Sequence, residues 1–372
     1  MHKILYVNGS SNIGGAEVSL FNLIKRLDRE CFLPIVVLPS SGPLFDKLKA
    51  LGLDVKIFPF GEFSRKKIFP FLLSTFKLAN LIKKEKIDLV HANSIYIAEQ
   101  SFFAAKLSGV PCVCHVRDLV PILGAGKIRS VAFKNTERLI AISEAVKKDL
   151  VEKLQVPENK IIRIYNGVDT KEFSPDISAN KFRGEFMLGS KKLVGMVGRF
   201  SPEKGQELFI KAAAEVIREY GDVNFIIVGD AKLGSEKFSM EMINLSNKLN
   251  LQDRVLFAGF RNDLPDALAA LDVLIVPSQA EPFGRVIIEA MAMQKPIIAS
   301  KSGSVPEIVT DKCGILFEPN NIEQLKRSII HLLQNRELSL GMGKYGRDVV
   351  VNNFNIDNHL IEIEKLYKEI LR

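Results

Sequence analysis

The sequence predicts an α/β fold built from two doubly wound parallel-sheet domains. Three observations lead to this prediction. The chain has 372 residues, more than one hydrophobic core usually organises, since domains average roughly 100 to 200 residues. Short apolar runs rich in β-formers alternate with amphipathic helical stretches. This alternation stops once, in the polar stretch 169–190, and then restarts. We therefore expect two domains facing a cleft, with a hinge near residues 170–190.

In the first half, the alternation begins with an apolar run at 4–7 and a helical stretch at 16–27, then repeats at 35–38 and 44–51. Further strand-sized runs occupy 89–92, 112–116, 139–143 and 161–164. Strands separated by helices of this length pair in parallel, and doubly wound sheets of this kind are Rossmann-like. The first domain is predicted to cover residues 1–175.

The second half repeats the pattern. Its strand-sized runs are 193–197, 225–228, 255–257, 273–276 and 296–299, which predict a second Rossmann-like domain over 176–354. The last segment, 355–372, has a helical pattern after a polar break at 352–355. We expect this helix to cross back to the first domain.

The bulk composition is that of a globular protein, with 47% hydrophobic and 25% charged residues. No uncharged apolar run approaches the roughly 18 residues that span a bilayer, and the chain opens on a strand without a signal-peptide pattern. We therefore expect a cytoplasmic protein. None of the four cysteines, Cys31, Cys112, Cys114 and Cys313, has zinc-ligand spacing, so neither zinc nor a disulfide is expected.

Positive charge is concentrated in the first half. Residues 1–180 hold 26 Lys and Arg against 18 Asp and Glu, whereas residues 181–372 hold 25 of each. An excess of positive charge in one half of the chain suggests an anionic partner, which could be a membrane surface, a phosphorylated lipid or nucleic acid. The stretch 61–77, with basic residues beside Phe and Leu and further lysines at 83–86, fits peripheral docking on the inner face of an anionic membrane. It equally fits a helix packed on the sheet with a solvated basic face.

A second basic set is more scattered. It comprises Lys127, Arg129, Lys134, Arg138, Lys147 and Lys148. Single-stranded nucleic acid would require aromatic residues interleaved on the same face, and the chain has no Trp and no recognition-module motif. Nucleic acid is therefore not an expected partner.

Parallel sheets bind ligands beyond the carboxyl ends of their strands, so the residues that follow each run are the candidates for a site. Gly14 and Gly15 follow the first strand and precede a helix, where backbone N–H groups can approach an anion. Arg199 and Lys204 follow the first strand of the second domain. Two cations there suit a diphosphate, although each loop also fits a plain turn.

The sharpest pattern runs from Glu281 to Glu289, after the buried run 273–276. Pro282 and Gly284 mark a turn, and a helix is expected to begin near Gly284. Glu281 would lie in the loop and Glu289 inside the helix, so that the two carboxylates address different parts of one extended ligand. Each can accept two hydrogen bonds from a vicinal diol.

The element from Glu281 to Glu289 resembles the E-x7-E motif of family 4 glycosyltransferases, which have the GT-B fold. The resemblance covers essentially the whole chain. Its other carriers are Gly14-Gly15-Ala16-Glu17, His115-Val116-Arg117-Asp118, Ser143-Glu144, Asn166-Gly167-Val168-Asp169, Gly198-Arg199, Lys204-Gly205 and Val228-Gly229-Asp230. Each motif is weak alone, but their order along the chain is specific.

This resemblance implies a donor site for a nucleotide diphosphate-sugar. Arg199 and Lys204 would hold the diphosphate, Glu289 the ribose, and Glu281 the transferred sugar. His115 would face the anomeric carbon, and Glu17 and Asp118 would contact the acceptor or brace loops. The remaining donor-binding candidates, which would approach the phosphates, sugar or base, are Gly14, Gly15, Gly198, Arg261, Leu264, Phe283, Gly284, Arg285 and Val286, with the base near Phe260.

The resemblance also implies transfer of a hexose-type sugar to a glycan or lipid-linked acceptor, with retention at the anomeric carbon, in polysaccharide or lipopolysaccharide assembly. No cofactor is expected. No Asp-x-Asp pair occurs in the sequence, so we predict no metal requirement, because Arg199, Lys204 and a helix N-terminus can supply the counter-charge. The alternatives are a nucleotide-sugar epimerase, a phosphorylase, and a non-catalytic protein that binds nucleotide-sugars on the same architecture.

Overall fold

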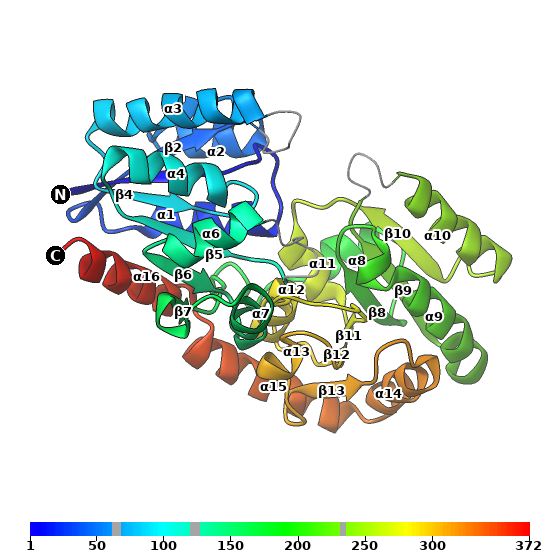
Figure 1. Cartoon of the computed structure of the whole chain (residues 1–372). Coiled ribbons are helices and arrows are strands. Elements are labelled where there is room, and N and C mark those ends of the chain that lie inside the picture. The colour runs from blue at the N-terminus through cyan, green and yellow to red at the C-terminus, as the bar shows by residue number, and fades with distance from the viewer. Residues whose placement is uncertain (62–67, 120–126, 231–235) are drawn as a thin grey trace. The chain divides into compact units, whose positions relative to one another are not determined.

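The computed structural model describes residues 1–61, 68–119, 127–230 and 236–372. The chain forms two compact units, one of residues 1–167 and 356–372 and one of residues 168–355. Each contains one parallel sheet flanked by helices (Figure 1). The first boundary, between Gly167 and Val168, lies eight residues before the predicted one. It falls inside the Asn-Gly-Val-Asp motif rather than after it.

The first unit contains a seven-stranded parallel sheet in the order β3-β2-β1-β4-β5-β6-β7. Its strands are β1 (His2–Val7), β2 (Phe32–Leu38), β3 (Asp54–Ile57), β4 (Leu89–Ala92), β5 (Cys112–Val116), β6 (Arg138–Ala141) and β7 (Ile161–Arg163). The central strands β4 and β5 are short and wholly buried, as the apolar runs in the sequence indicate. The strand order reverses between β1 and β4, which are hydrogen-bonded neighbours.

Helices cover both faces of this sheet (Figure 1). One face packs against α1 (Gly15–Arg26), α2 (Pro43–Ala50) and α16 (Ile356–Ile370) in a shared apolar core. The remaining helices of the unit are α3 (Ile68–Glu85), α4 (Ala98–Ser108), α6 (Lys127–Asn135), α7 (Glu144–Leu154) and the 3-10 helix η1 (Glu158–Lys160). The C-terminal α16 is therefore a structural part of the first unit, and Tyr367 and Ile363 lie in its core.

The second unit contains a six-stranded parallel sheet in the order β10-β9-β8-β11-β12-β13. Its strands are β8 (Lys192–Val197), β9 (Val223–Val228), β10 (Val255–Gly259), β11 (Val273–Val276), β12 (Ile297–Ser300) and β13 (Gly314–Phe317). Five of these were expected. The sequence reading missed β13, whose run is only four residues long and begins with a glycine, and which is recognisable mainly through its pairing with β12.

The helices of the second unit are α8 (Asn180–Glu185), η2 (Pro202–Lys204), α9 (Gln206–Tyr220), α10 (Glu236–Lys248), α11 (Leu264–Ala270), α12 (Arg285–Ala292), α13 (Val305–Ile308), α14 (Ile322–Gln334) and α15 (Arg336–Asn353). Side chains of α9, α10 and α14 form one core with the sheet. The strand order reverses between β8 and β11, so the loops after these two strands flank a topological switch point, where α/β sheets usually bind ligands.

Candidate functional site

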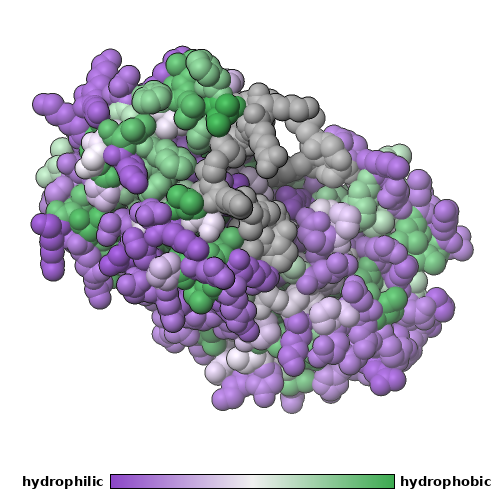
Figure 2. All heavy atoms as spheres, in the orientation of Figure 1, coloured by the Kyte–Doolittle hydropathy of each residue, from purple (hydrophilic) through white to green (hydrophobic). Residues whose placement is uncertain are grey.

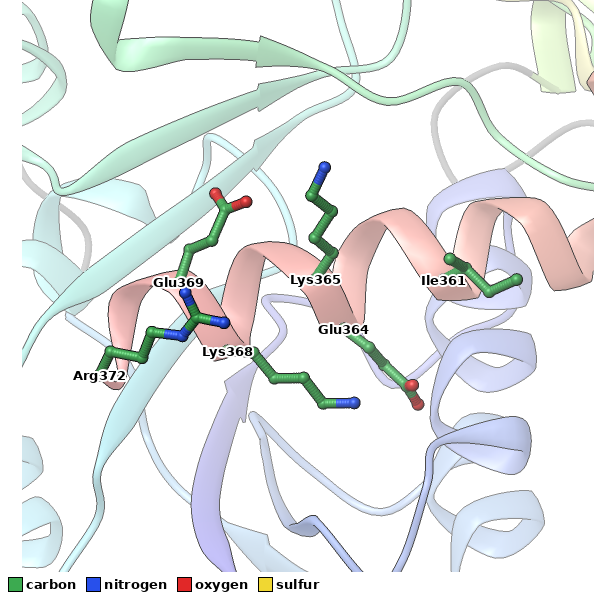
Figure 3. Close-up of a pocket in the computed structure, with 6 residues that line it drawn as sticks. All are labelled: Ile361, Glu364, Lys365, Lys368, Glu369 and Arg372. Atoms are coloured by element: carbon green, nitrogen blue, oxygen red, sulfur yellow. The ribbon is translucent and has the colours of Figure 1, made fainter.

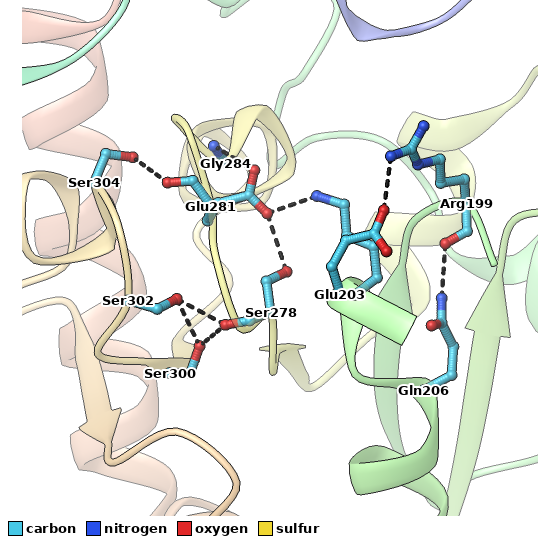
Figure 4. Close-up of polar contacts among 10 residues, drawn as sticks. Arg199, Glu203, Gln206, Ser278, Glu281, Gly284, Ser300, Ser302 and Ser304 are labelled. Atoms are coloured by element: carbon cyan, nitrogen blue, oxygen red, sulfur yellow. Dashed lines mark hydrogen bonds and ion pairs between the residues drawn. The ribbon is translucent and has the colours of Figure 1, made fainter. Parts of the chain in front are cut away.

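The predicted catalytic pair Lys204 and Glu281 meets at the switch point of the second unit. Lys204 ends η2, after β8, and Glu281 follows β11. The Lys204 Nζ lies 2.7 Å from Glu281 Oε2. The same carboxylate oxygen accepts a hydrogen bond from Ser278 Oγ at 3.0 Å, and Oε1 accepts one from the Gly284 N–H at 3.1 Å (Figure 4). Glu281 is 6% exposed, so neighbouring donors, rather than water, hold its negative charge.

Backbone contacts also fix the main chain of Glu281. Its carbonyl oxygen accepts hydrogen bonds from the Ser304 N–H at 2.9 Å and from Ser304 Oγ at 3.2 Å. Ser300 and Ser302 bind the carbonyl of Ser278 (Figure 4). The serine-rich loop after β12 therefore positions the loop after β11. This loop was not among the sites predicted from the sequence, although its three serines lie at the end of β12.

Gly303 permits this close approach, and its replacement by alanine should disable the site. A Cβ at Gly303 would lie 2.2 Å from the Glu281 carbonyl oxygen, and its φ is +54°. We expect Gly303→Ala to displace Glu281 and to lower the rate of a reaction at this site by about 100-fold, because a displacement of about 1 Å can reduce catalysis by that factor. Steady-state kinetics would measure this loss.

Gly189→Ala is the matched control, because Gly189 has a φ of +55° with no atom within 4 Å of the added Cβ. Both variants carry the same backbone strain, so equal rate losses would show that the contact with Glu281 is irrelevant.

Arg199 lies in the loop after β8. Its Nη2 is 2.8 Å from Glu203 Oε1, and its carbonyl accepts a hydrogen bond from Gln206 Nε2 at 2.8 Å (Figure 4). The Arg199 side chain is 52% exposed, so this ion pair is weak and can exchange for a ligand phosphate at low cost. Gly198, just before it, is hydrogen-bonded through its N–H to the carbonyl of Val228.

The second carboxylate, Glu289, lies within α12. It forms an ion pair with Arg285 one turn earlier, at 2.7 Å, and both side chains are largely buried. Burial raises the pKa of Glu289, and the charge of Arg285 opposes that rise. Gly284 is the residue before the helix, with a φ of +79°. Its N–H donates to Glu281, so in this state that group serves the carboxylate, whereas we expected it to approach the sugar or phosphate.

Phe283 and Val286, which flank Gly284 and Arg285 in the sequence, and Leu264, near Arg261, were also predicted to bind the donor. Phe283 is 2% exposed and makes an edge contact with Phe354. Val286 belongs to the first turn of α12, and Leu264 is the first residue of α11.

The predicted base-binding residue Arg261 is engaged on both sides. Its guanidinium forms two-point ion pairs with Glu185, at 2.5 and 2.8 Å, and with Asp263, at 2.8 and 2.7 Å. It also lies over the rings of Phe182 and Phe186. These contacts tie α8 to the loop after β10. Phe260, the residue directly after β10, is 59% exposed.

In the first unit, the predicted catalytic residue His115 is buried within the sheet. It lies inside β5 rather than beyond it, and its side chain is 0% exposed. The His115 ring packs between His91 and His359, with ring centroids 5.5 and 6.0 Å away. Burial, together with the charge of Arg117, holds its pKa well below the usual range. His115 is thus the second-last residue of β5, within the strand-sized run 112–116 that the sequence predicts.

The glycine loop begins α1 as predicted, with Gly14 before the helix and Gly15 as its first residue. Glu17 Oε2 accepts a hydrogen bond from the Gly14 N–H at 3.0 Å, which fits the brace we considered for Glu17. Asp118 is half-buried, two residues beyond β5. The sequence analysis passed over three polar residues directly after strands of this sheet, namely Asn8, Asn93 and Arg117.

One surface hollow lies along α16, far in sequence from every predicted site residue. It is lined by Ile361, Glu364, Lys365, Lys368, Glu369 and Arg372 (Figure 3). Sugar-nucleotide sites in α/β sheets lie at the carboxyl ends of strands, so this hollow is not a candidate for the donor.

Two family models match the chain. The model described as Glycosyltransferase Family 4 matches residues 13–172, and the one described as Glycosyl transferases group 1 matches residues 179–349. The first model covers most of the first unit, and the second model covers most of the second unit.

Similar proteins are found in sequence and in structure. The UDP-Gal:alpha-D-GlcNAc-diphosphoundecaprenol alpha-1,3-galactosyltransferase of Escherichia coli is 31% identical, over 99% of this chain and 97% of its own. The N-acetyl-alpha-D-glucosaminyl L-malate synthase of Bacillus anthracis is 26% identical, over 80% of this chain and 78% of its own. The crystal structure of Anabaena Alr3699/HepE with UDP and glucose has a TM-score of 0.88 at 26% identity, covering 99% of this chain and 100% of its own.

Proposed function

Because this chain belongs to the family 4 glycosyltransferases, which have the GT-B fold, we propose that it transfers a hexose from a UDP-hexose to a lipid diphosphate-linked sugar. The observation that carries this proposal is the Lys204–Glu281 pair at the switch point of the second sheet. A cation and a carboxylate 2.7 Å apart offer one group for a diphosphate and one for sugar hydroxyls.

The choice of donor and acceptor draws on the relatives. The Escherichia coli relative is named for UDP-Gal and a diphosphoundecaprenol-linked acceptor, and the Anabaena structure contains UDP and glucose. Lys204 and Arg199 would neutralise the leaving UDP, Glu289 would accept from the ribose hydroxyls, and Glu281 from the hexose. The biological role we propose is a step in cell-surface polysaccharide or lipopolysaccharide assembly.

The stereochemical proposal is retention. A front-face displacement, in which the leaving phosphate helps to accept the acceptor's proton, requires no separate carboxylate base. The bond between the anomeric carbon and the UDP oxygen breaks, and the acceptor oxygen bonds to the same face while its proton passes to the leaving phosphate. This role of the phosphate fits a site in which both buried carboxylates are already paired with cations.

The test is transfer of labelled sugar by the purified protein. UDP-galactose, UDP-glucose and GDP-mannose are each offered with a polyprenyl diphosphate-linked N-acetylglucosamine, with and without that acceptor. We expect acceptor-dependent transfer from a UDP-hexose and an α-linkage in the nuclear magnetic resonance spectrum of the product. A β-linkage would exclude retention, and isomerised donor formed without acceptor would favour the epimerase alternative.

We predict that transfer requires no divalent metal. Arg199, Lys204 and the N-terminus of α12 are positioned on one sheet edge and can supply the counter-charge that a metal would. Excess chelator should therefore leave the rate within about twofold of its starting value. Loss of activity on chelation, with recovery on adding back one divalent ion, would contradict this prediction.

We also propose that α3 docks on an anionic membrane. No helix among the described residues is long and apolar enough to cross a membrane. However, one face of α3 exposes five apolar side chains, which we name the α3 stripe: Ile68, Phe69, Leu72, Leu73 and Phe76. Figure 2 shows hydrophobic side chains gathered over this helix. Lys77, Lys83 and Lys84 on α3 are exposed as well, and apolar residues beside lysines suit a lipid surface. The basic residues 65–67 and Lys127 lie outside the residues whose side chains are described.

Vesicle flotation tests this docking. We expect the protein to float with vesicles containing about one-third anionic lipid, and less at high salt, because each lysine contributes about 1 kcal/mol at such a surface. Leu73→Glu should reduce the bound fraction about fivefold or more. Leu340→Glu is the matched control, since Leu340 on α15 is 52% exposed and Leu73 is 51% exposed. Equal binding by both variants would exclude the α3 stripe.

A further inference from the structure

A buried polar network lies at the switch point of the first sheet, where β1 and β4 are neighbours. Asn8 follows β1, Asn93 follows β4 and Arg117 follows β5. Asn8 and Asn93 are 0% exposed and Arg117 is 8% exposed. Buried polar side chains at such a position require matched partners, because an unmatched one costs about 1 to 3 kcal/mol. The donor and acceptor roles in this network therefore fix the orientation of each amide side chain.

Arg117 forms two hydrogen bonds with Asn93. Its Nε donates to the Asn93 carbonyl oxygen at 3.1 Å, and its Nη2 donates to Asn93 Oδ1 at 3.0 Å. A guanidinium can only donate, so the amide oxygen of Asn93 must face Arg117. The Asn93 amide nitrogen then faces the other way, where it donates to Asn8 Oδ1 at 2.8 Å and to the carbonyl of Ala16 at 3.2 Å.

The same reasoning passes from Asn93 to Asn8 and on to α1. Because Asn8 Oδ1 accepts from Asn93, the Asn8 amide nitrogen points onward, to the Ser10 carbonyl at 2.6 Å and Glu17 Oε1 at 3.4 Å. The other oxygen of Glu17 accepts the Gly14 N–H at 3.0 Å. Along the path from Arg117 through Asn93 and Asn8 to Glu17, each residue donates to the next, from the cation to the carboxylate, and the path ends on the first residues of α1.

Two further groups orient the guanidinium. Its Nη1 donates to Asn166 Oδ1 at 2.9 Å, and its Nη2 lies 3.2 Å from His115 Nδ1. Since Arg117 is the donor, His115 Nδ1 is the acceptor, and the neutral ring carries its proton on Nε2, which has no hydrogen-bond partner among the described residues. Its contacts make His115 a support for Arg117 rather than a group at the edge of the sheet.

We propose that Arg117 is a positioning residue that sets the hydrogen-bond direction of this network and thereby the backbone geometry at the start of α1. The inference rests on the proposed function in one respect, namely that the ligand is a nucleotide diphosphate-sugar, whose phosphates the N–H groups of the Gly14–Gly15 turn would approach as expected from the sequence. Arg117 acts on the donor through Asn93 and Asn8, so its loss weakens donor binding while leaving acceptor binding and the chemical step in place.

Asn93→Asp is the sharpest variant. It keeps an oxygen toward Arg117 but removes the amide donor to Asn8 and Ala16, so the network is cut at one defined point with little change in volume. Arg117→Gln removes the guanidinium that donates to the two oxygens of Asn93. We expect each to raise the donor KM about tenfold, with the acceptor KM and kcat within about twofold. Arg117→Lys, which can still donate to Asn93 Oδ1, should recover part of the loss.

Two more readouts separate positioning from general destabilisation. The donor KM of the double variant Arg117→Gln/Asn93→Asp should be no higher than that of the more impaired single variant, because the two residues act in series. Hydrogen–deuterium exchange should be about tenfold faster in the segment 14–18 of Asn93→Asp, with other helices unchanged. Arg163→Gln is the control, since Arg163 on β7 forms a half-exposed pair with Glu144.

The exchange readout requires no activity, so the inference and the proposed function can fail separately. Exchange at the wild-type rate in segment 14–18 of Asn93→Asp would overturn the positioning role whatever the enzyme transfers. A change in acceptor KM without a change in donor KM would also overturn it. By contrast, a wild-type protein that neither binds UDP nor transfers hexose, yet shows the faster exchange in the variant, would refute the proposed function alone.

Discussion

Replacing Lys204 by alanine is expected to lower kcat/KM for the nucleotide-sugar by about 1,000-fold, which corresponds to about 4 kcal/mol of transition-state stabilisation. The Lys204 Nζ is the closest cation to Glu281, at 2.7 Å, and its side chain is 25% exposed. A partly buried ammonium is a strong electrostatic group because water screens it little. Its removal leaves the developing charge of the leaving UDP without that partner and Glu281 without its ion pair.

Lys211→Ala is the control for this variant. Lys211 lies in the neighbouring helix α9 and pairs with Glu207 at 2.6 Å, where both side chains are about half exposed. Initial rates at varied UDP-hexose would give kcat and KM for each variant. If Lys204 served only to hold Glu281, then Lys204→Ala and Glu281→Gln would be no worse together than apart, and losses that add up would assign each its own contact with the donor.

The first unit is expected to lose stability steeply between pH 6.5 and pH 4. Three imidazoles are buried together: His91 on β4 and His359 on α16 lie on either side of the His115 ring of β5, with ring centroids 5.5 and 6.0 Å from it. Burial, with the charge of Arg117, lowers the pKa of His91 to about 3. Burial lowers the pKa of His359 to about 4, although its hydrogen bond to the Tyr165 carbonyl opposes the shift. The pKa of His115 is also held far below normal.

The sign follows from proton counting. Each folded-state pKa lies below the unfolded value of about 6.5, so between these values the unfolded chain binds more protons and stability falls as pH falls. At pH 5 His91 and His359 each cost about 2 kcal/mol relative to pH 7, and His115 adds a loss in the same direction. Above pH 7 this contribution is complete and does not change further.

Calorimetric unfolding at pH 7, 6 and 5 would measure the effect. We expect His359→Gln to reduce the pH dependence by about one-third, because one of three titrating groups is gone. His331→Gln, at an exposed position on α14, is the control. A wild-type unfolding temperature that stays constant between pH 7 and 5 would show that the imidazoles are not held neutral.

The approach of Lys204 to Glu281 could be predicted from the sequence. Lys204 follows β8 and Glu281 follows β11, and the carboxyl ends of these neighbouring parallel strands share one edge of the sheet. The ion pair of Arg261 could not be predicted from the sequence, because its partner Glu185 is 76 residues away and lies in a short helix whose packing no local pattern indicates.

By itself, the amino-acid sequence determined the fold class, most strands and the loops that carry the site, because apolar periodicity and turn residues act over a few neighbouring positions. The tertiary structure decided what depends on which strands become neighbours. The pairs Lys204–Glu281 and Asn8–Asn93 join residues 77 and 85 positions apart, and each forms only because strand order reverses at that point of its sheet. Whether a polar side chain serves the ligand or the scaffold is thus fixed by hydrogen-bond partners that meet only when the sheet is complete.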